Sequence, residues 1–507
     1  MKQLNYSIFL PPFLLLLISV ILSIFFTEGF LKYVKQLNQW ILQYFDWLFS
    51  WSTFLLVFIL VVTYFSPIAK LKIGGKDALP LLTKWQWFSI TLCTTIATGI
   101  LFWGTAEPIY HLNGTPEMLN IADGSKDAAH FAMSTMYMHW TITPYSIYTV
   151  AALVFALSFY NLKQPFNIRA LLFPAFNKQG NYAWLNIVNV LCLFALVAGM
   201  AASLGTGILT ISGGLNSLFS FTQTTFLNFI IAATIVIAFS ISASTGLLKG
   251  IKFLSVLNIR AFIGLAIFIA ITGPTIEMIK LGFSGFEEYV STFFQRSTNL
   301  GSNINTEWQQ SWTVFYWANW LAWTPVTALF LGRIAKGYTV KQFIKFNLIL
   351  PSIFSGFWMT VFSGTALNFD TLKPAGMLNT VLQTDGPQNV IYTILEQLPF
   401  SAIVSTIFLV IIFISFVTAA DSNTSALSSI STKNLTTNNT EGAAIVKYLW
   451  GFIIGALAFV MISFSGIEGV KILSTIGGFP ILFLMIVVAY GLLKMVFVKS
   501  YFERLAC

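Results

Sequence analysis

Apolar stretches of about 20 residues recur along the whole chain, and short polar segments that hold most of the charges separate them. In a helix with a rise of about 1.5 Å per residue, one such stretch covers the roughly 30 Å hydrocarbon core of a bilayer. The pattern predicts an all-α polytopic membrane protein with twelve transmembrane spans, at residues 7–27, 49–68, 86–111, 132–160, 184–211, 225–243, 251–273, 312–334, 343–366, 400–420, 444–466 and 472–496.

Composition and charge agree with this prediction. Of the 507 residues, 56% are hydrophobic and 9% are charged, whereas a soluble protein carries roughly a quarter charged residues. The net charge of +9 comes from Lys and Arg that are scattered over loops. This distribution does not indicate a nucleic-acid partner. Most of these residues fall in alternate loops, so the positive-inside rule places both termini in the cytoplasm and the protein in the plasma (inner) membrane.

Three of the predicted spans carry small or hydroxyl residues where an apolar helix is expected. Span 86–111 contains TTIATGILFWGTAEP, span 184–211 contains AGMAASLGTG, and span 400–420 runs on into VTAADSNTS. Gly weakens a helix, and Thr and Ser offer the backbone other hydrogen-bond partners. In transporters, interrupted helices expose carbonyls and amides that bind ions and carboxylates. The alternative is close helix packing through small residues.

Two aromatic groups lie within spans rather than at their ends. Trp317, Trp320 and Trp323 recur at every third residue, so their rings share one arc of a helix. A second arc holds Trp140, Tyr145 and Tyr148. Aromatic faces attract a quaternary ammonium, which has no N–H to donate. Two facing arcs therefore predict a cage for such a ligand, although an interfacial belt with ordinary helix packing is the alternative.

Four acidic or basic side chains fall in or near spans, namely Asp46, Glu107, Arg260 and Asp421. Arg260 lies about 12 Å deep, and an intramembrane charge is a hypothesis of function by default. A structural ion pair is the alternative.

The three histidines form no HExxH motif and no nucleophile–base motif, so we expect no enzymatic activity. We expect His139 to serve packing or hydrogen bonding. The three cysteines show no metal-ligand or disulfide spacing.

Several motifs together resemble one family. The segment FYWANWLAWTPVTALFLGRIAKG at 315–337 is similar to the signature of the betaine/choline/carnitine transporter family. Supporting matches occur in the family's order: GTAEP at 104–108, MHWTITPYSIY at 138–148, ASLGTGILTISGGL at 202–215, LKGIKFLSVLNI at 248–259 and VTAADS at 417–422. The resemblance implies transport by alternating access, commonly by a homotrimer.

The resemblance also implies a fold and a division of the chain. It places a leucine-transporter-type inverted repeat of five plus five helices in spans 3–12. The resulting parts are two N-terminal helices (1–85), the first repeat (86–273), an outer amphipathic connecting helix (274–311), the second repeat (312–498) and a short cytoplasmic tail (499–507).

Carried over by position, the resemblance implies a substrate site at Trp140, Tyr145, Tyr148, Trp320 and Trp323, with Tyr110 matching a substrate contact of the carnitine exchangers. Tyr145 and Asn319 stand where many members have Trp. Choline-selective members often have Asp at the position of Gly99. Choline is a bare cation that gains from a carboxylate, whereas betaine or carnitine brings its own. Gly99 therefore favours a glycine betaine-like or carnitine-like zwitterion.

The resemblance leaves ion coupling open. Sodium-coupled members use a Thr-Ser pair with carbonyls of the broken helix; here Thr418 remains and Ala419 replaces the Ser. The candidate ion-coupling residues are Ala97, Thr98, Thr418 and Arg260, although the exchangers' Arg aligns with Asn258 instead.

Several alternatives therefore stay open. They are symport with Na⁺ or H⁺, choline uptake by H⁺ symport, and sodium-independent exchange. A ligand-gated channel or a sensor is a more distant alternative from another class. No cofactor is expected apart from Na⁺ as a candidate coupling ion.

Overall fold

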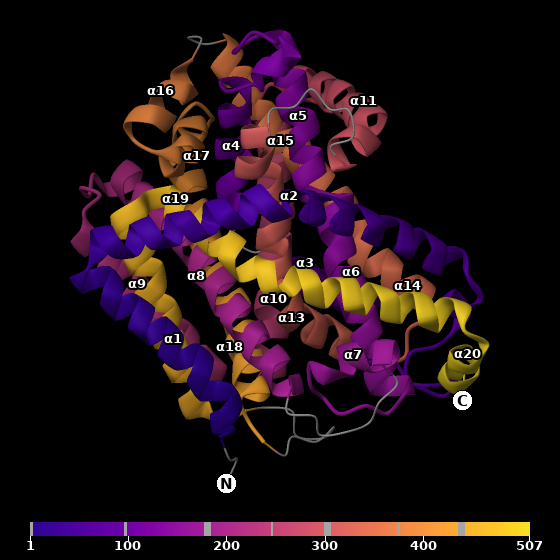
Figure 1. Cartoon of the computed structure of the whole chain (residues 1–507). Coiled ribbons are helices and arrows are strands. Elements are labelled where there is room, and N and C mark those ends of the chain that lie inside the picture. Colours follow the sequence, from indigo (N-terminus) through magenta and orange to yellow (C-terminus); the bar gives the residue numbers. More distant parts are fainter. Residues whose placement is uncertain are drawn as a thin grey trace.

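The computed structural model describes residues 4–95, 99–176, 184–244, 247–298, 306–372, 376–433 and 442–506. Within these ranges the chain is almost wholly helical (Figure 1), and its only β-type pairings are two isolated bridges, Leu4 with Thr432 and Lys72 with Thr339. This agrees with the predicted all-α class. The fully buried backbone groups of a membrane-spanning segment must pair internally, and a helix does this within one segment.

The helices follow one another in chain order, and three π-helical and two 3₁₀ turns join some of them. The first half contains α1 (Tyr6–Phe25), α2 (Thr27–Phe65), η1 (Pro67–Lys70), α3 (Lys84–Thr95), α4 (Gly99–Leu112), η2 (Glu117–Leu119), α5 (Lys126–Trp140), α6 (Ile142–Ala156), η3 (Leu157–Asn161), α7 (Arg169–Phe176), α8 (Trp184–Phe219), α9 (Thr225–Ser244) and α10 (Leu247–Thr272). The second half contains α11 (Thr275–Thr298), α12 (Thr306–Gln309), η4 (Gln310–Val314), α13 (Phe315–Ile334), α14 (Val340–Ile344), η5 (Lys345–Ile349), α15 (Leu350–Leu372), α16 (Met377–Thr384), α17 (Pro387–Glu396), α18 (Ser401–Ile430), α19 (Ala444–Phe497) and α20 (Lys499–Ala506).

The chain is a multi-pass membrane protein by the length and apolarity of its helices. In the described part, 7 helices are long and apolar enough to cross a bilayer, or up to 9 if each of two bent pairs counts as one span. All twelve predicted stretches lie on helices. The Trp-rich stretch 312–334 is not among the helices counted, because it is not apolar enough. The count of twelve and the inverted repeat therefore stay predictions.

The last two predicted spans belong to one helix, α19, which bends sharply at Gly466. This residue has φ 54° and ψ −138°, a backbone conformation that glycine adopts without a steric penalty. The helix has 54 residues, and if it were straight it would extend for about 80 Å, well beyond a bilayer. The bend allows its second half to pack along α13, where Gly478 lies against the backbone of Ala318.

The predicted interruption of span 86–111 is confirmed. Helices α3 and α4 meet at an angle of 55°, and residues 96–98 between them lie outside the described part. The other two small-residue stretches are not interrupted, because α8 and α18 run through them continuously. In α8 the small residues permit close packing instead. A Cβ on Gly207 would lie 1.6 Å from the Phe416 ring of α18, so only glycine fits there.

The connection after α10 begins with a helix. Pro274 follows α10, and α11 continues at 110° to it. Its position along the outer membrane surface stays a prediction. In Figure 1, α11, α16 and α17 lie at the top, whereas both ends of the chain lie in the lower half. The relation of these sides to the cytoplasm stays a prediction.

The C-terminal segment is not a loose tail. Residues Lys499–Ala506 form α20, which is held by two hydrogen bonds: the Tyr501 hydroxyl donates to the Pro174 carbonyl (2.9 Å), and the Asn161 amide donates to the Leu505 carbonyl (2.8 Å). The sequence interpretation of 499–507 as a tail missed this docking, because it depends on partners far away in the chain.

Candidate functional site

The candidate site begins at a break between α5 and α6. Trp140 is the last residue of α5, and the next residue, Thr141, has non-helical angles (φ −116°, ψ −111°). Pro144 explains the break: proline has no backbone N–H and clashes within a helix interior, but it fits the first turn of a new helix. Across this break, Trp140 of α5 and the aromatic residues of α6 reach the same neighbour, α13.

The two predicted aromatic arcs meet on Trp320 of α13. Its ring centroid lies 5.8 Å from that of Trp140, 5.6 Å from that of Tyr145 and 5.0 Å from that of Tyr148. The interplanar angles of 57–76° are those of edge-to-face and tilted pairs, which aromatic quadrupoles favour. All four side chains are at most 3% exposed, so none of them faces lipid.

A cavity of about 50 Å³ adjoins these rings. Six of the predicted residues line it, namely Gly99, Trp140, Tyr148, Asn319, Trp320 and Trp323. The sequence interpretation missed the other lining residues: Thr94, Thr95, Trp103, Ala202, Ser203, Thr206, Phe315 and Val470. Most of these lie in the small-residue stretches or the aromatic stretch, so a signal existed for them, but Val470 carried none. The lining set contains hydroxyls and rings and no charged side chain.

Two predicted residues lie outside this lining set. Tyr145 contacts Trp320 but donates to, or accepts from, the Ser355 hydroxyl of α15 (2.8 Å). The Tyr110 ring is tilted against that of Trp312, with the centroids 5.2 Å apart, and Trp312 precedes Trp320 by about two helical turns. We therefore assign Tyr145 a supporting position behind Trp320. Asn319 lines the cavity, and its side-chain carbonyl accepts a hydrogen bond from Ser474 of α19 (3.0 Å).

Two glycines set the positions of cage rings. A Cβ on Gly99 would lie 3.1 Å from the Trp140 ring, and one on Gly199 would lie 3.1 Å from the Trp323 ring. Both contacts are tighter than ordinary van der Waals separation, so glycine lets each indole approach the backbone of a neighbouring helix. Gly99 is the first residue of α4, directly after the break in that span.

A buried carboxylate, Glu107 of α4, anchors the cage. Its side chain is fully buried and accepts four hydrogen bonds, from Trp140 Nε1 (2.8 Å), His139 Nδ1 (2.7 Å), His111 Nε2 (3.2 Å) and the Tyr316 hydroxyl. Both oxygens of this buried carboxylate therefore have hydrogen-bond partners within the protein. The sequence interpretation noted Glu107 as a charge near a span but gave it no role. It expected His139 to serve hydrogen bonding, which the contacts bear out.

Among the described residues, Glu107, His111 and His139 also form a group with metal-ligand spacing. Their ligand atoms all lie within 4.8 Å of one another. The hydrogen bonds favour a different role. Each histidine must carry its proton on the nitrogen that faces Glu107, and His139 Nε2 then accepts from Thr313 (3.0 Å). With every carboxylate lone pair used by a donor, the arrangement fits a hydrogen-bonded anchor for Trp140 better than a metal site.

Two of the four candidate ion-coupling residues, Thr418 and Arg260, fall within the described part of the chain. Ala97 and Thr98 lie outside the described residues. Thr418 is buried, and its hydroxyl donates to the Ile414 carbonyl of its own helix (2.7 Å). Arg260 lies on an exposed face of α10. Asn258, which aligns with the exchangers' Arg, is buried and donates to Ser415 of α18 (2.8 Å), so the two positions face opposite ways as the helical spacing predicts.

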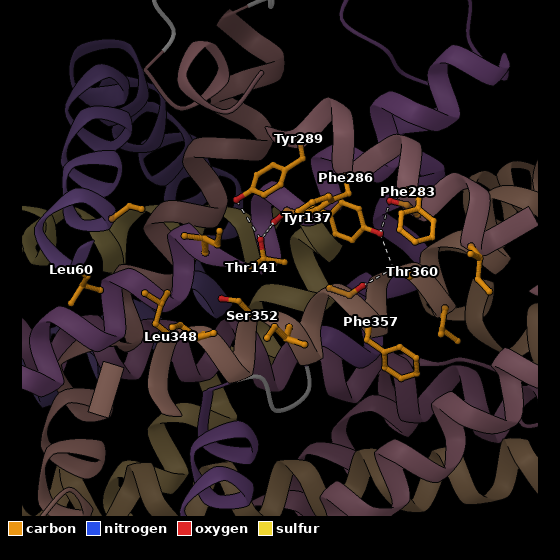
Figure 2. A pocket seen from close by; sticks show the side chains of 18 of the residues that line it. Leu60, Tyr137, Thr141, Phe283, Phe286, Tyr289, Leu348, Ser352, Phe357 and Thr360 are labelled. Carbon is orange, nitrogen blue, oxygen red and sulfur yellow. Dashed lines mark hydrogen bonds between the residues drawn. The ribbon is translucent and has the colours of Figure 1, made fainter. Parts of the chain in front are cut away.

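A larger cavity lies elsewhere. It holds about 1000 Å³ between α2, α11, α15 and the back of the α5–α6 break. Figure 2 shows two pairs among its few polar groups: the Tyr137 hydroxyl with that of Thr360 (2.7 Å), and the Thr141 hydroxyl with that of Tyr289 (3.4 Å). The buried Ser352 hydroxyl has no hydrogen-bond partner among the described residues. None of its lining residues is charged, and several are apolar and exposed, such as Phe283 and Phe357. A surface of this kind suits lipid tails or another apolar surface.

A multi-span helical chain with interrupted helices around a small, ring-lined cavity has the features of a membrane transporter. The family model of the betaine/carnitine/choline family transporters matches residues 7–500. The chain therefore belongs to this family, whose members are transporters and not enzymes.

Among its relatives are three named transporters. It is 28% identical to an ectoine/hydroxyectoine transporter of Virgibacillus pantothenticus, over 97% of each chain. It is 30% identical to a glycine betaine/proline/choline/ectoine transporter of Vibrio parahaemolyticus, over 91% of this chain and 81% of the relative. It is 28% identical to a high-affinity choline transport protein of Escherichia coli, over 98% and 73%.

Proposed function

We propose that this protein is a secondary active transporter that carries a quaternary ammonium zwitterion, of the glycine betaine or carnitine type, across the plasma membrane by alternating access. The single observation behind the proposal is that the rings of Trp140, Tyr145 and Tyr148 converge on Trp320 beside a cavity without charged lining. A methylated ammonium needs electron-rich faces and no hydrogen-bond acceptor, and this arrangement supplies them.

The small volume of the cavity corresponds to a closed arrangement of the cage. A volume of about 50 Å³ is well below the roughly 150 Å³ that accepts a group as large as benzene. The rings therefore have to separate before a trimethylammonium group enters, each face staying within about 6 Å of the cation. Movement of α13 relative to α5 and α6, as alternating access requires, would open this space.

The opposite end of a zwitterion needs hydrogen-bond donors. The Trp320 indole N–H is buried and has no hydrogen-bond partner among the described residues, and leaving such a donor unpaired costs about 1–3 kcal/mol. Thr94, Ser203 and Thr206 add hydroxyls to the lining. Gly99 brings no carboxylate, which favours a substrate that carries its own. The names of the relatives include betaine, choline and ectoine transporters, which supports this substrate class.

The coupling ion and the assembly are further parts of the proposal. Thr418 keeps one of the two hydroxyls of a sodium-coupled member, so Na⁺ or H⁺ symport is favoured slightly over exchange. We propose a homotrimer with both termini in the cytoplasm, from the family resemblance and from the charge distribution of the loops.

The test is uptake of labelled betaine, choline and carnitine into liposomes that contain the purified protein, with and without Na⁺ and pH gradients. The proposal expects saturable betaine or carnitine uptake that one of the gradients drives. Acceleration by internal substrate would identify a carrier and exclude a channel or a sensor. Uptake of choline without uptake of either zwitterion would contradict the proposed substrate class.

A further inference from the structure

Lys471 of α19 lies next to the candidate cavity, and its ammonium group contacts aromatic rings there. It lies shortly after the bend at Gly466, is half-buried, and directly follows Val470, a lining residue. Its ammonium nitrogen is 3.7 Å from the centroid of the Trp312 ring and 5.8 Å from that of Phe315. This is a cation–π contact. The lysine occupies an aromatic face of the kind that attracts cationic ligands.

Two ring contacts connect this ammonium with the Glu107 carboxylate. The Trp312 ring lies 4.6 Å from that of His111, and His111 Nε2 lies 3.2 Å from Glu107 Oε1. The ammonium and the carboxylate are therefore at most about 13 Å apart, close enough to interact through a medium of low dielectric constant. In the described part of the chain, no carboxylate lies within 4.0 Å of Lys471, so its charge is not consumed by a direct ion pair.

Without a compensating charge, Glu107 would favour a bare cation in the cage. Its carboxylate is hydrogen-bonded to Trp140, which lines the cavity, and each histidine beside it turns one ring nitrogen toward the carboxylate. A single negative charge at this position attracts choline, whereas a zwitterion, whose two charges nearly cancel, gains much less from it. A positive charge at a similar distance removes that preference.

We propose that Lys471 is a specificity-determining residue, whose ammonium on Trp312 offsets the Glu107 charge beside the cage and so favours a zwitterion over a bare cation. The inference rests on the proposed function, since it concerns which member of the substrate class is preferred. It is independent of Gly99, which acts by leaving a carboxylate out of the cavity, whereas Lys471 acts on a carboxylate that is already present behind its wall.

The test compares the ratio of kcat/KM for choline to that for glycine betaine in liposomes, for the wild type and Lys471→Met. Removing the Lys471 charge removes its repulsion of a bare cation in the cage. At about 12 Å in a medium of effective dielectric constant about 20, one such repulsion corresponds to about tenfold in affinity, so we expect the ratio to rise by up to about tenfold. Lys471→Arg keeps the charge and should stay within about twofold of the wild type. Lys280→Met, which removes an exposed lysine of α11 far from the lining, is the matched control for net charge.

Binding measured by tryptophan fluorescence gives the same comparison for a variant that folds but does not transport. An unchanged ratio in Lys471→Met, with both substrates weakened equally, would overturn the proposal and leave Lys471 a packing residue. An equal rise in Lys280→Met would overturn it as well, because the effect would then come from net charge. A wild type that binds and transports neither compound overturns the proposed function itself, and this inference with it, before any variant is measured.

Discussion

Two cavities on the same chain differ in almost every respect. One holds about 50 Å³ and is lined by indoles, hydroxyls and an amide from α3, α4, α5, α6, α8, α13 and α19; the other holds about 1000 Å³ and is lined mainly by aliphatic and phenyl groups of α2, α11 and α15. The small one has the Glu107 carboxylate and its hydrogen-bond donors behind its wall, whereas no charged side chain lines the large one. Chemistry rather than volume therefore marks the candidate site.

The comparison also separates two kinds of packing. Three rings each lie 5.0–5.8 Å from the ring of Trp320, so a change at Trp320 affects the packing of all three. In the large cavity, Phe283 and Phe357 are 74% and 41% exposed, so the loss of either ring removes few packing contacts. If the small cavity is the functional site, changes to its residues should impair uptake more than changes to the large cavity.

The largest effect is expected for Trp320→Ala. This change removes the ring that all three other cage residues contact, and a desolvated cation–π contact is worth about 2 kcal/mol or more, so kcat/KM for the substrate should fall at least about 30-fold. Uptake into liposomes measures it, and Trp320→Phe should recover part of the loss. Near-normal uptake in Trp320→Ala would place the substrate elsewhere.

The next largest effect is expected for Glu107→Gln. The variant replaces a carboxylate with an amide that accepts at one oxygen only, and a hydrogen bond to a charged group is worth about 1.5–3 kcal/mol, so uptake should fall about tenfold or more and the Tm should fall by several degrees. Thermal unfolding in detergent measures the Tm, and the fluorescence of the tryptophans reports whether Trp140 keeps its position. A Tm and a fluorescence spectrum equal to those of the wild type would show that the carboxylate does not hold Trp140.

A smaller effect is expected for Gly99→Ala. The added methyl would meet the Trp140 ring at 3.1 Å, and overpacking at such a contact costs about 1–3 kcal/mol, so KM should rise about fivefold with little change in expression. The matched control is Gly264→Ala in α10, where a Cβ would meet nothing within 4 Å. Equal behaviour of the two variants would mean that Trp140 has room to move and that its position is not critical.

The smallest effect is expected for Phe357→Ala in the large cavity. The ring is partly exposed and contacts neither the cage nor Glu107, so the initial rate of uptake should stay within about twofold of the wild type. A loss as large as that of Trp320→Ala would reverse the comparison and make the large cavity the functional one.

The sequence by itself determined the class of structure and much of the candidate site. Apolar stretches of bilayer length allow only helices, so the fold class followed from hydropathy alone. The two aromatic arcs indicated Trp140, Tyr148, Trp320 and Trp323, and the cluster around Gly99 indicated the broken span, because helical periodicity and glycine content act locally. The family resemblance added Gly99 and Asn319 to the lining residues.

The tertiary structure decided everything that depends on partners distant in the chain. Gly207 and its neighbours resembled the residues of a broken helix, yet they serve close packing against Phe416, and only the position of α18 distinguishes the two roles. The place of Tyr145 behind Trp320, the four donors that converge on Glu107, and the approach of Lys471 to Trp312 each join residues from separate helices. A helical pattern fixes which face a side chain occupies but not which helix lies opposite, since that choice is made by the packing of the whole bundle.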